Sequence, residues 1–361
     1  MVKNESVARK SVLSACVKLC DLGLVERTWG NVSARLDDEY FLITPSGRSY
    51  DNLSENELVK VRISDRKYEG DILPSSEKGV HAAIYAARKD VGFIVHTHQN
   101  AATVVSIAGN DLNTADFSAL GGVTPCAEYA LPSTIELAES VRDAVVHSSG
   151  CNAALMRHHG VVCFGKDSEE CFEAALALEE LCRDILSAVP VTMQLCAPLG
   201  SSIKSGNAFK LRDCDEDGEY SIECNCSSEK AKLHRQIYTN TDAQFIMHCS
   251  SSAVLNAARM FERVPAYVDD FTQIIGEDIM RVESCDVIAS KLQNRNAVLI
   301  KDFGAMCFGK SEDDCKAAAS ILEKNCLAAL YAECIGGCTP ISPEHSKYLR
   351  DFYVNTYEKR K

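Results

Sequence analysis

Two histidines stand one residue apart directly after an apolar run, in FIVHTHQN at residues 93–100. In an extended strand, residues i and i+2 point to the same face about 6.5–7 Å apart, which would place His96 and His98 side by side. Two neutral imidazoles in that arrangement can bind one zinc ion at Zn–N distances of about 2.0–2.1 Å. The alternative is a pair of hydrogen-bonded histidines at a strand end, and a third ligand is needed to decide.

Candidates for the third ligand lie in LMRHHGVV at residues 155–162. His159 precedes Gly160, where the backbone can turn sharply and approach another chain segment closely. His158 is adjacent and must point elsewhere, so we expect only one of the two to bind a metal. Either histidine could instead be structural.

A carboxylate that could act as a base is Glu77, which follows Ser75 and Ser76 at the start of an expected helix. One interpretation is plain helix capping, since a proline, two serines and an acid are common in a first turn. The other is an anion site, because a helix N-terminus offers free N–H groups and a favourable dipole. A carboxylate beside a bound phosphate and a metal could serve as a general base.

Alternating helices and strands are predicted to position these residues. Apolar spacing predicts a helix from residue 5 to near Gly23 and helices over residues 75–89, 133–145 and 167–186. A capping box of Ser133 and Glu136 is expected to open the third helix, and Asp167 with Glu170 the fourth. Strands are expected over 31–36, 40–45 and 91–98, with a strand pair over 152–165. This alternation indicates an α/β fold, arranged as an α/β/α three-layer sandwich.

Composition and charge narrow the function classes. The net charge of −13 disfavours nucleic-acid and anionic-membrane partners, since both need a basic surface. No stretch of about 20 apolar residues occurs, so no membrane span is expected. Glu5 and further charges stand where a signal peptide would have its apolar core, and most of the 18 cysteines lie inside apolar segments. We therefore expect a cytoplasmic protein with reduced, buried thiols.

An internal repeat divides the chain. VVCFGKDSEECFEAALALEELC, from Val161, and AMCFGKSEDDCKAAASILEKNC, from Ala305, share ten identities without a gap. A second pair lies upstream in the same order, SSEKGVHAAIYAARKDVGFIVH from Ser75 and SSEKAKLHRQIYTNTDAQFIMH from Ser227. The order indicates two copies of one domain, which we place at residues 1–195 and 196–361. The polar segment 199–221 is interpreted as a linker or as a rebuilt start of the second copy.

The first copy resembles the class II aldolase/adducin superfamily, whose best-known enzymes are L-fuculose-1-phosphate aldolase and L-ribulose-5-phosphate 4-epimerase. The resemblance runs from about residue 5 to 190 and keeps six motifs in order: TWGNVSARL, ITPSG, PSSEKGVH, VHTH, CAEYALPS and RHHGVV. It implies a class II aldolase fold in two tandem copies. It also implies a zinc-dependent aldehyde-lyase that cleaves a phosphorylated sugar or a related hydroxy-carbonyl compound.

The resemblance assigns roles to individual positions. The family's divalent metal, usually zinc, is held by the two histidines of HxH and the histidine before the glycine, so one ion per chain is expected at His96, His98 and His159. The family's catalytic glutamate falls on Glu77. Its phosphate-binding residues fall on Asn31, Ser46, Gly47, Ser75 and Ser76.

One family feature is missing from the first copy. The fuculose-phosphate aldolases have a tyrosine on the loop before GG, whereas the loop here reads NTADFSALGG, and Asp116 is the candidate for proton transfer at the departing aldehyde. Epimerase and dehydratase relatives use the same metal triad, and adducin's head domain is a non-enzymatic member. A pentulose-phosphate 4-epimerase, a dehydratase and an assembly domain are therefore the alternatives.

The second copy departs further. His248 matches His96, but Ser250 stands for His98 and Phe303 stands for His159, so no metal is expected there. Family members are typically tetramers with active sites between neighbouring subunits. A degenerate second copy could take a neighbour's place, and we expect a homodimer that forms a four-domain pseudo-tetramer.

Overall fold

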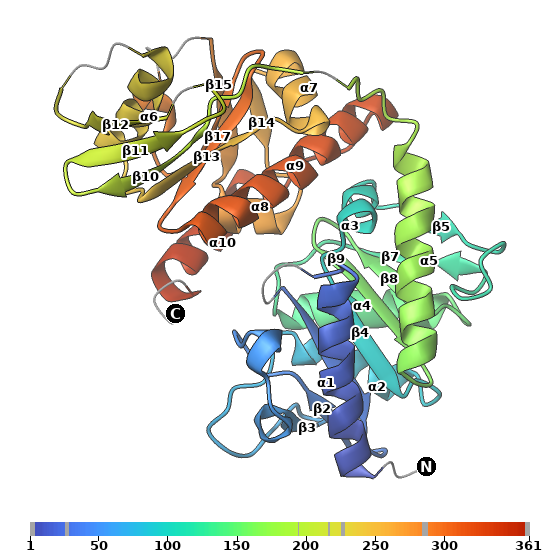
Figure 1. Ribbon diagram of the computed structural model, residues 1–361. Helices are drawn as coiled ribbons and strands as arrows, with labels where there is room; N and C mark the ends of the chain where they lie inside the picture. Colours follow the sequence, from blue (N-terminus) through green and yellow to red (C-terminus); the bar gives the residue numbers. More distant parts are fainter. Residues whose placement is uncertain are drawn as a thin grey trace. The chain divides into compact units, whose positions relative to one another are not determined.

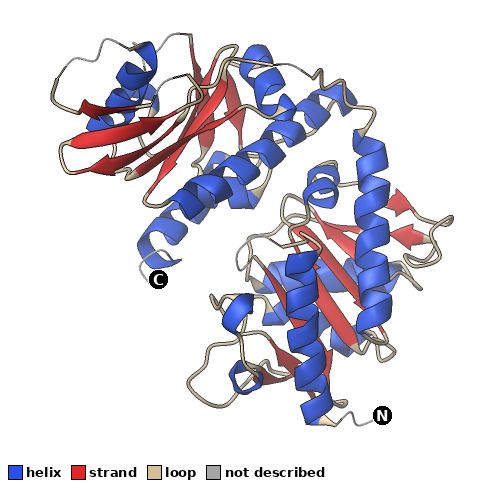
Figure 2. Ribbon diagram, in the orientation of Figure 1, coloured by secondary structure: helices blue, strands red, loops and turns tan. Residues whose placement is uncertain are grey.

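The computed structural model describes residues 4–25, 29–193, 195–215, 217–224, 228–283 and 288–357. They form two compact units, Met1–Ala188 and Val189–Lys361. In each unit a large, mainly antiparallel sheet lies between helices (Figures 1 and 2). The predicted α/β sandwich in two tandem copies is confirmed.

The sheet of the first unit has seven strands in the order β3-β2-β1-β4-β9-β8-β7. Neighbouring strands are antiparallel except for the parallel pair β7 and β8. The strands are β1 (Gly30–Arg35), β2 (Tyr40–Ile43), β3 (Val59–Arg62), β4 (Phe93–Thr97), β7 (Cys126–Ala127), β8 (Ala153–Met156) and β9 (Gly160–Gly165), with a separate ribbon of β5 (Leu112–Asn113) and β6 (Val123–Thr124).

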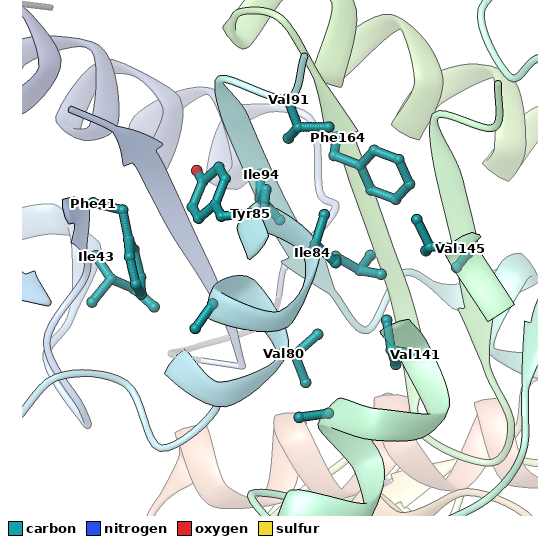
Figure 3. Close-up of a cluster of buried hydrophobic side chains, with 14 of the residues drawn as sticks. Phe41, Ile43, Val80, Ile84, Tyr85, Val91, Ile94, Val141, Val145 and Phe164 are labelled. Atoms are coloured by element: carbon teal, nitrogen blue, oxygen red, sulfur yellow. The ribbon is translucent and has the colours of Figure 1, made fainter. Parts of the chain in front are cut away.

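Helices cover both faces of this sheet. Among the described residues these are α1 (Glu5–Asp21), α2 (Lys78–Ala87), α3 (Asn100–Ser106), α4 (Ile135–His147) and α5 (Ser168–Leu186), with short 3-10 helices η1 (Tyr50–Asn52) and η2 (Glu55–Glu57). Helices α2 and α4 pack on one face, while α1, α3 and α5 lie on the other. Figure 3 shows the core under α2 and α4, where Val80, Ile84 and Val141 belong to one buried cluster with Ile94 of β4. Burying such a side chain stabilises the fold by about 1.5–3 kcal/mol.

The core also sets the direction of the HxH pair. Ile94 points into the α2–α4 cluster, and side chains alternate along a strand. His96 and His98 therefore share the face of Ile94 and meet the N-terminus of α2, while Thr97 points to the opposite face.

Two predicted helix starts have different outcomes. Asp167 is the N-cap of α5 and accepts hydrogen bonds from the backbone N–H groups of Glu169 and Glu170, as expected. The predicted cap at Ser133 is wrong, because Ser133 has a φ of 67°. Thr134 is the N-cap of α4, and its side chain accepts from the N–H of Leu137.

The second unit has an eight-stranded sheet in the order β12-β11-β10-β13-β17-β16-β15-β14. Its strands are β10 (Ser201–Ser205), β11 (Ala208–Arg212), β12 (Gly218–Ser221), β13 (Phe245–Cys249), β14 (Arg263–Pro265), β15 (Asp278–Val282), β16 (Ala297–Ile300) and β17 (Gly304–Gly309). Its helices are α6 (Glu229–Asn240), α7 (Ser252–Met260), α8 (Asp269–Ile274), α9 (Glu312–Ile335) and α10 (Pro343–Phe352), with the 3-10 helix η4 (Ala289–Lys291) and the π-helical turn η5 (Tyr353–Tyr357).

The central strands follow the same order in the two sheets. The order β1-β4-β9-β8 of the first unit recurs as β10-β13-β17-β16 in the second. Residues 199–221 are not a linker, because β10, β11 and β12 lie in them, so this segment is the rebuilt start of the second copy. Its polar composition hides an alternating pattern in which Phe209 and Leu211 are buried and Lys210 is exposed. Ser227, where the second SSEK repeat begins, lies outside the described residues, as does Thr28 of TWGNVSARL.

The cysteine expectation holds only in part. Cys163, Cys171 and Cys307 are buried free thiols, and burial raises the pKa of each. Cys20 and Cys334 are exposed. Within the described ranges, every helix is too short or too polar to cross a membrane.

Candidate active site

Four side chains converge over β1, β4 and β9 beside the start of α2. His96, His98 and His159 have ring centroids 4.7–5.0 Å apart. The carboxylate of Glu77 reaches His96 Nε2 at 2.8 Å and His159 Nε2 at 3.0 Å. His96, His159 and Glu77 are buried and His98 is half-buried. A strand, a turn and a helix start, distant in sequence, thus supply one cluster.

The turn between β8 and β9 settles which of the two adjacent histidines joins the cluster. His158 adopts a left-handed backbone conformation with φ of 63°, and its ring lies edge-on to Tyr129 at 5.3 Å. His159 then faces His96, with the two rings stacked at 5.0 Å. The histidine directly before Gly160 is therefore the third member of the cluster.

The tautomer of His96 fits a metal ligand. Its Nδ1 lies 2.8 Å from the carbonyl oxygen of Val161, which can only accept, so Nδ1–H donates. Nε2 of the neutral ring then carries a lone pair and points at His98 Nε2, 2.9 Å away. Burial lowers the pKa of His96 and favours this neutral form. Clustered imidazole nitrogens beside a carboxylate match the donors that zinc prefers, and the three histidines form a group able to hold a cation.

Glu77 occupies the N-cap position of α2. Its side chain makes no capping hydrogen bond, and it is the hydroxyl of Ser75 that accepts from the backbone N–H of Glu77, at 3.2 Å. Burial alone would raise the pKa of the Glu77 carboxyl, but the His159 imidazole, whose Nε2 lies 3.0 Å from the carboxylate, outweighs it and holds that pKa well below its usual range. The carboxylate is therefore ionised inside the cluster.

The predicted phosphate-binding residues lie on neighbouring segments. Asn31 of β1 stands directly opposite His96 of β4. The turn with Ser46 and Gly47 is tied to the start of α2, because Ser46 N–H donates to Leu73 and Ser75 N–H donates to Thr44. Gly47 has a φ of 67°, which favours glycine. Ser75 is buried, while Gly47 and Ser76 are exposed.

Asp116 is the remaining predicted site residue. It lies on an exposed turn after β5, and among the described residues it makes no hydrogen bond or ion pair with the cluster. Its role stays a prediction.

His81 lies next to the site but is not among the residues predicted from the sequence. It is fully buried and contacts Asn31 Oδ1 through Nε2 at 2.5 Å. The sequence signal for His81 lies inside the repeated segments that begin at Ser75 and Ser227, where HAAIY at residues 81–85 recurs as HRQIY at residues 234–238.

Gly160 offers a test of the close packing around the cluster. A Cβ there would lie 2.6 Å from the carbonyl oxygen of Thr97 and 3.3 and 3.4 Å from the rings of His98 and His96. Because the nearest atom belongs to the backbone of β4, the strands must shift, and we expect Gly160→Ala to lower the free energy of unfolding by about 1–3 kcal/mol. Metal affinity should fall as well, as measured by denaturant unfolding and zinc titration.

Gly79 provides the control for that substitution. In Gly79→Ala the new Cβ would meet Ala138 Cβ at 3.6 Å, an ordinary van der Waals contact between α2 and α4. This variant should keep wild-type stability and zinc affinity. Equal behaviour of the two variants would contradict the packing argument.

The matching position in the second unit is built differently. His248 Nδ1 accepts from the N–H of Leu199 at 3.2 Å, and Nε2 donates to the carbonyl oxygen of Phe303 at 2.6 Å. Ser250 is exposed and Phe303 is 37% exposed. Both ring nitrogens of the one retained histidine are therefore bonded to backbone.

Comparisons with known proteins agree with the division into two units. The model of the family described as Class II Aldolase and Adducin N-terminal domain matches twice, over residues 10–186 and 188–330. L-fuculose phosphate aldolase of Escherichia coli (strain K12) is 34% identical over 186 residues, which is 51% of this chain and 84% of that protein. The 5-methylthioribulose-1-phosphate/5-deoxyribulose-1-phosphate aldolase of Rhodospirillum rubrum is 34% identical over 48% of this chain and 77% of its own length.

A solved structure, named L-fuculose 1-phosphate aldolase, is 27% identical, with a TM-score of 0.46 over 52% of this chain and 91% of that one. The family matches cover most of the chain, one in each unit. The chain therefore belongs to the class II aldolase and adducin family.

Proposed function

We propose that this chain is a divalent-metal-dependent aldolase that cleaves a phosphorylated ketose or a related hydroxy-carbonyl compound, with its active site in the first unit. The observation that carries the proposal is the convergence of three imidazoles and one buried carboxylate, with His96 Nε2 2.9 Å from His98 Nε2 and 2.8 Å from Glu77. The aldolases that match about half of the chain support the same reaction class.

The reaction requires stabilisation of negative charge. A divalent cation held by His96, His98 and His159 would act as a Lewis acid on the substrate oxygens as the C–C bond breaks. Glu77, ionised beside these imidazoles, would exchange the proton at the carbon left behind. Asp116 is the proposed partner for proton transfer at the oxygen of the departing aldehyde.

The phosphate would fix the reacting carbon in place. Asn31, Ser46, Gly47, Ser75 and Ser76 lie on three segments tied together by backbone hydrogen bonds. Ser75 can donate through its hydroxyl while its oxygen accepts from the N–H of Glu77. Holding the phosphate at a fixed distance from the cluster would lower the entropy cost of the reaction.

A substrate screen tests the proposal. The zinc-loaded chain is offered ketose 1-phosphates, pentulose 5-phosphates and the matching unphosphorylated ketoses, and products are separated by mass and stereochemistry. We expect release of an aldehyde together with a phosphorylated three-carbon ketone from a ketose 1-phosphate. Epimerisation without cleavage, or loss of water, would replace the aldolase with one of the other reactions of the family. A chain that neither turns over nor binds zinc would favour an assembly role like that of adducin's head domain.

The second unit yields a prediction about assembly. It has lost the ligand positions at Ser250 and Phe303 but keeps the long helix α9 and the central strand order of the first unit. We propose that it packs as a sibling domain, so that two chains form a four-domain ring. Light scattering should then give twice the chain mass of 39.5 kDa, and a monomer at micromolar concentration would contradict this.

A further inference from the structure

A buried chain of hydrogen bonds runs from α2 to the predicted phosphate site. Tyr85 Oη lies 2.8 Å from Ser33 Oγ, and Ser33 Oγ lies 2.6 Å from His81 Nδ1. His81 Nε2 then lies 2.5 Å from Asn31 Oδ1. Tyr85, Ser33 and His81 are 0% exposed and Asn31 is 5% exposed. None of the first three residues belongs to the metal cluster.

The direction of donation along these hydrogen bonds decides whether Asn31 presents its N–H groups or its oxygen to a ligand. If His81 carries its proton on Nε2, it donates to the Asn31 carbonyl oxygen Oδ1, and the two N–H groups of Nδ2 remain for another acceptor. If the proton were on Nδ1, Nε2 would accept, so the Asn31 amide would have to rotate its Nδ2–H toward His81. Its oxygen would then face the ligand. Within the described part of the chain, no group hydrogen-bonds to Asn31 Nδ2.

The second unit contains an equivalent chain of hydrogen bonds, and there the direction of donation is fixed. Tyr238 Oη lies 2.9 Å from Ser202 Oγ, which lies 2.7 Å from His234 Nδ1. His234 Nε2 lies 2.8 Å from the backbone carbonyl oxygen of Leu199. A carbonyl can only accept, so Nε2 of His234 must donate, and Nδ1 must accept from Ser202.

The strand registers show that the two chains of hydrogen bonds occupy equivalent places in their units. Ser33 pairs with Ile94 in the first unit, and Ser202 pairs with Ile246 in the second. By the same register, Gly200 stands where Asn31 would be. The unit that has lost its metal ligands thus keeps the tyrosine, serine and histidine and replaces only the terminal amide with a backbone carbonyl.

We propose that His81 is a positioning residue, whose Nε2–H holds the Asn31 amide with its oxygen turned inward and its N–H donors facing the substrate phosphate. The inference rests on the proposed function, because it takes the phosphate to lie against Asn31. Burial, and secondly the nearby His96, lower the pKa of His81 to about 3, so the ring stays neutral at working pH.

The expected effect of losing His81 falls on phosphate binding. An amide free to rotate would place its oxygen toward the phosphate part of the time, and two acceptors repel. A hydrogen bond to a charged group is stronger than one between neutral groups. Removing the Nε2 donor should therefore weaken phosphate binding about 10–100-fold and raise KM while kcat changes little.

Two substitutions separate the donor from the bulk of the ring. In His81→Gln the side-chain amide reaches the place of Nε2 and can still donate to Asn31, whereas in His81→Asn it reaches only the place of Nδ1. His234→Asn is the matched control, since it breaks the equivalent chain where no asparagine follows. We expect His81→Asn to lose phosphate affinity, His81→Gln to retain most of it, and His234→Asn to match the wild type.

The experiment measures inorganic phosphate binding by calorimetry on the full-length, zinc-loaded chain, so it does not depend on turnover. Equal phosphate affinity in the wild type and a folded His81→Asn variant would overturn the positioning role and leave the proposed function intact. A wild type that binds no phosphate would overturn both.

Nitrogen-15 NMR of the histidine-labelled wild type is a second test, and it does not depend on whether any variant folds. A proton on Nε2 of His81 supports the proposal, and a proton on Nδ1 overturns it.

Discussion

Replacing Glu77 with glutamine should leave the fold and the zinc content unchanged and lower kcat by about 10²–10⁴. Glutamine has the shape of glutamate and can still hydrogen-bond, but it cannot exchange a proton with carbon. In the structure the Glu77 carboxylate lies within 2.8 and 3.0 Å of two of the three imidazoles. It is therefore an ionised group beside the imidazoles that would hold the metal.

Steady-state kinetics and metal analysis on the same preparation check this prediction. Glu229→Gln is the matched control, because Glu229 follows Ser228 in the second SSEK repeat and is exposed beside Lys232. That variant should turn over like the wild type. Near-normal kcat in Glu77→Gln, with full zinc content, would remove Glu77 from the proposed mechanism.

The zinc content of the chain should be one ion, bound in the first unit, and His98→Ala should abolish it together with the activity. Three imidazoles converge there, and two remaining ligands leave too few donors to hold the ion against buffer. In the second unit His248 has both nitrogens bonded to backbone groups. Elemental analysis of the wild type and the variant measures the stoichiometry directly.

Ser250→Ala serves as the control for this loss, since Ser250 occupies the position that His98 holds in the first unit. It should keep one ion per chain and wild-type activity. Two ions in the wild type, or one ion retained in His98→Ala, would mean that the metal lies elsewhere.

Strand alternation, a local rule, was sufficient to predict that His96 and His98 share one face, whereas Glu77 and His159 were expected from the family resemblance. Two histidines at i and i+2 had to lie on one face, and the repeat placed the same strand in both units. The choice between His158 and His159 could not be made locally. It follows from the left-handed backbone of His158 and from the pairing of β8 with β9.

Other features depend on partners far away in the chain. The role of His81 requires Ser33 on one side and Asn31 on the other, both about 50 residues upstream. The tautomer of His96 depends on the carbonyl of Val161, which becomes its neighbour only when β4 pairs with β9. The segment 199–221 looked like a linker because its composition is polar, although Phe209 and Leu211 are buried in its strands.

The two matching histidines, His96 and His248, hold their protons on opposite nitrogens, and this has a consequence for evolution and for engineering. In His96 the proton is on Nδ1, whereas in His248 Nε2 donates to Phe303. Reintroducing histidine at Ser250 and Phe303 would therefore not rebuild a zinc site in the second unit. The ring of His248 would first have to give up two backbone hydrogen bonds and exchange tautomer. Two substitutions alone would therefore not restore the lost site.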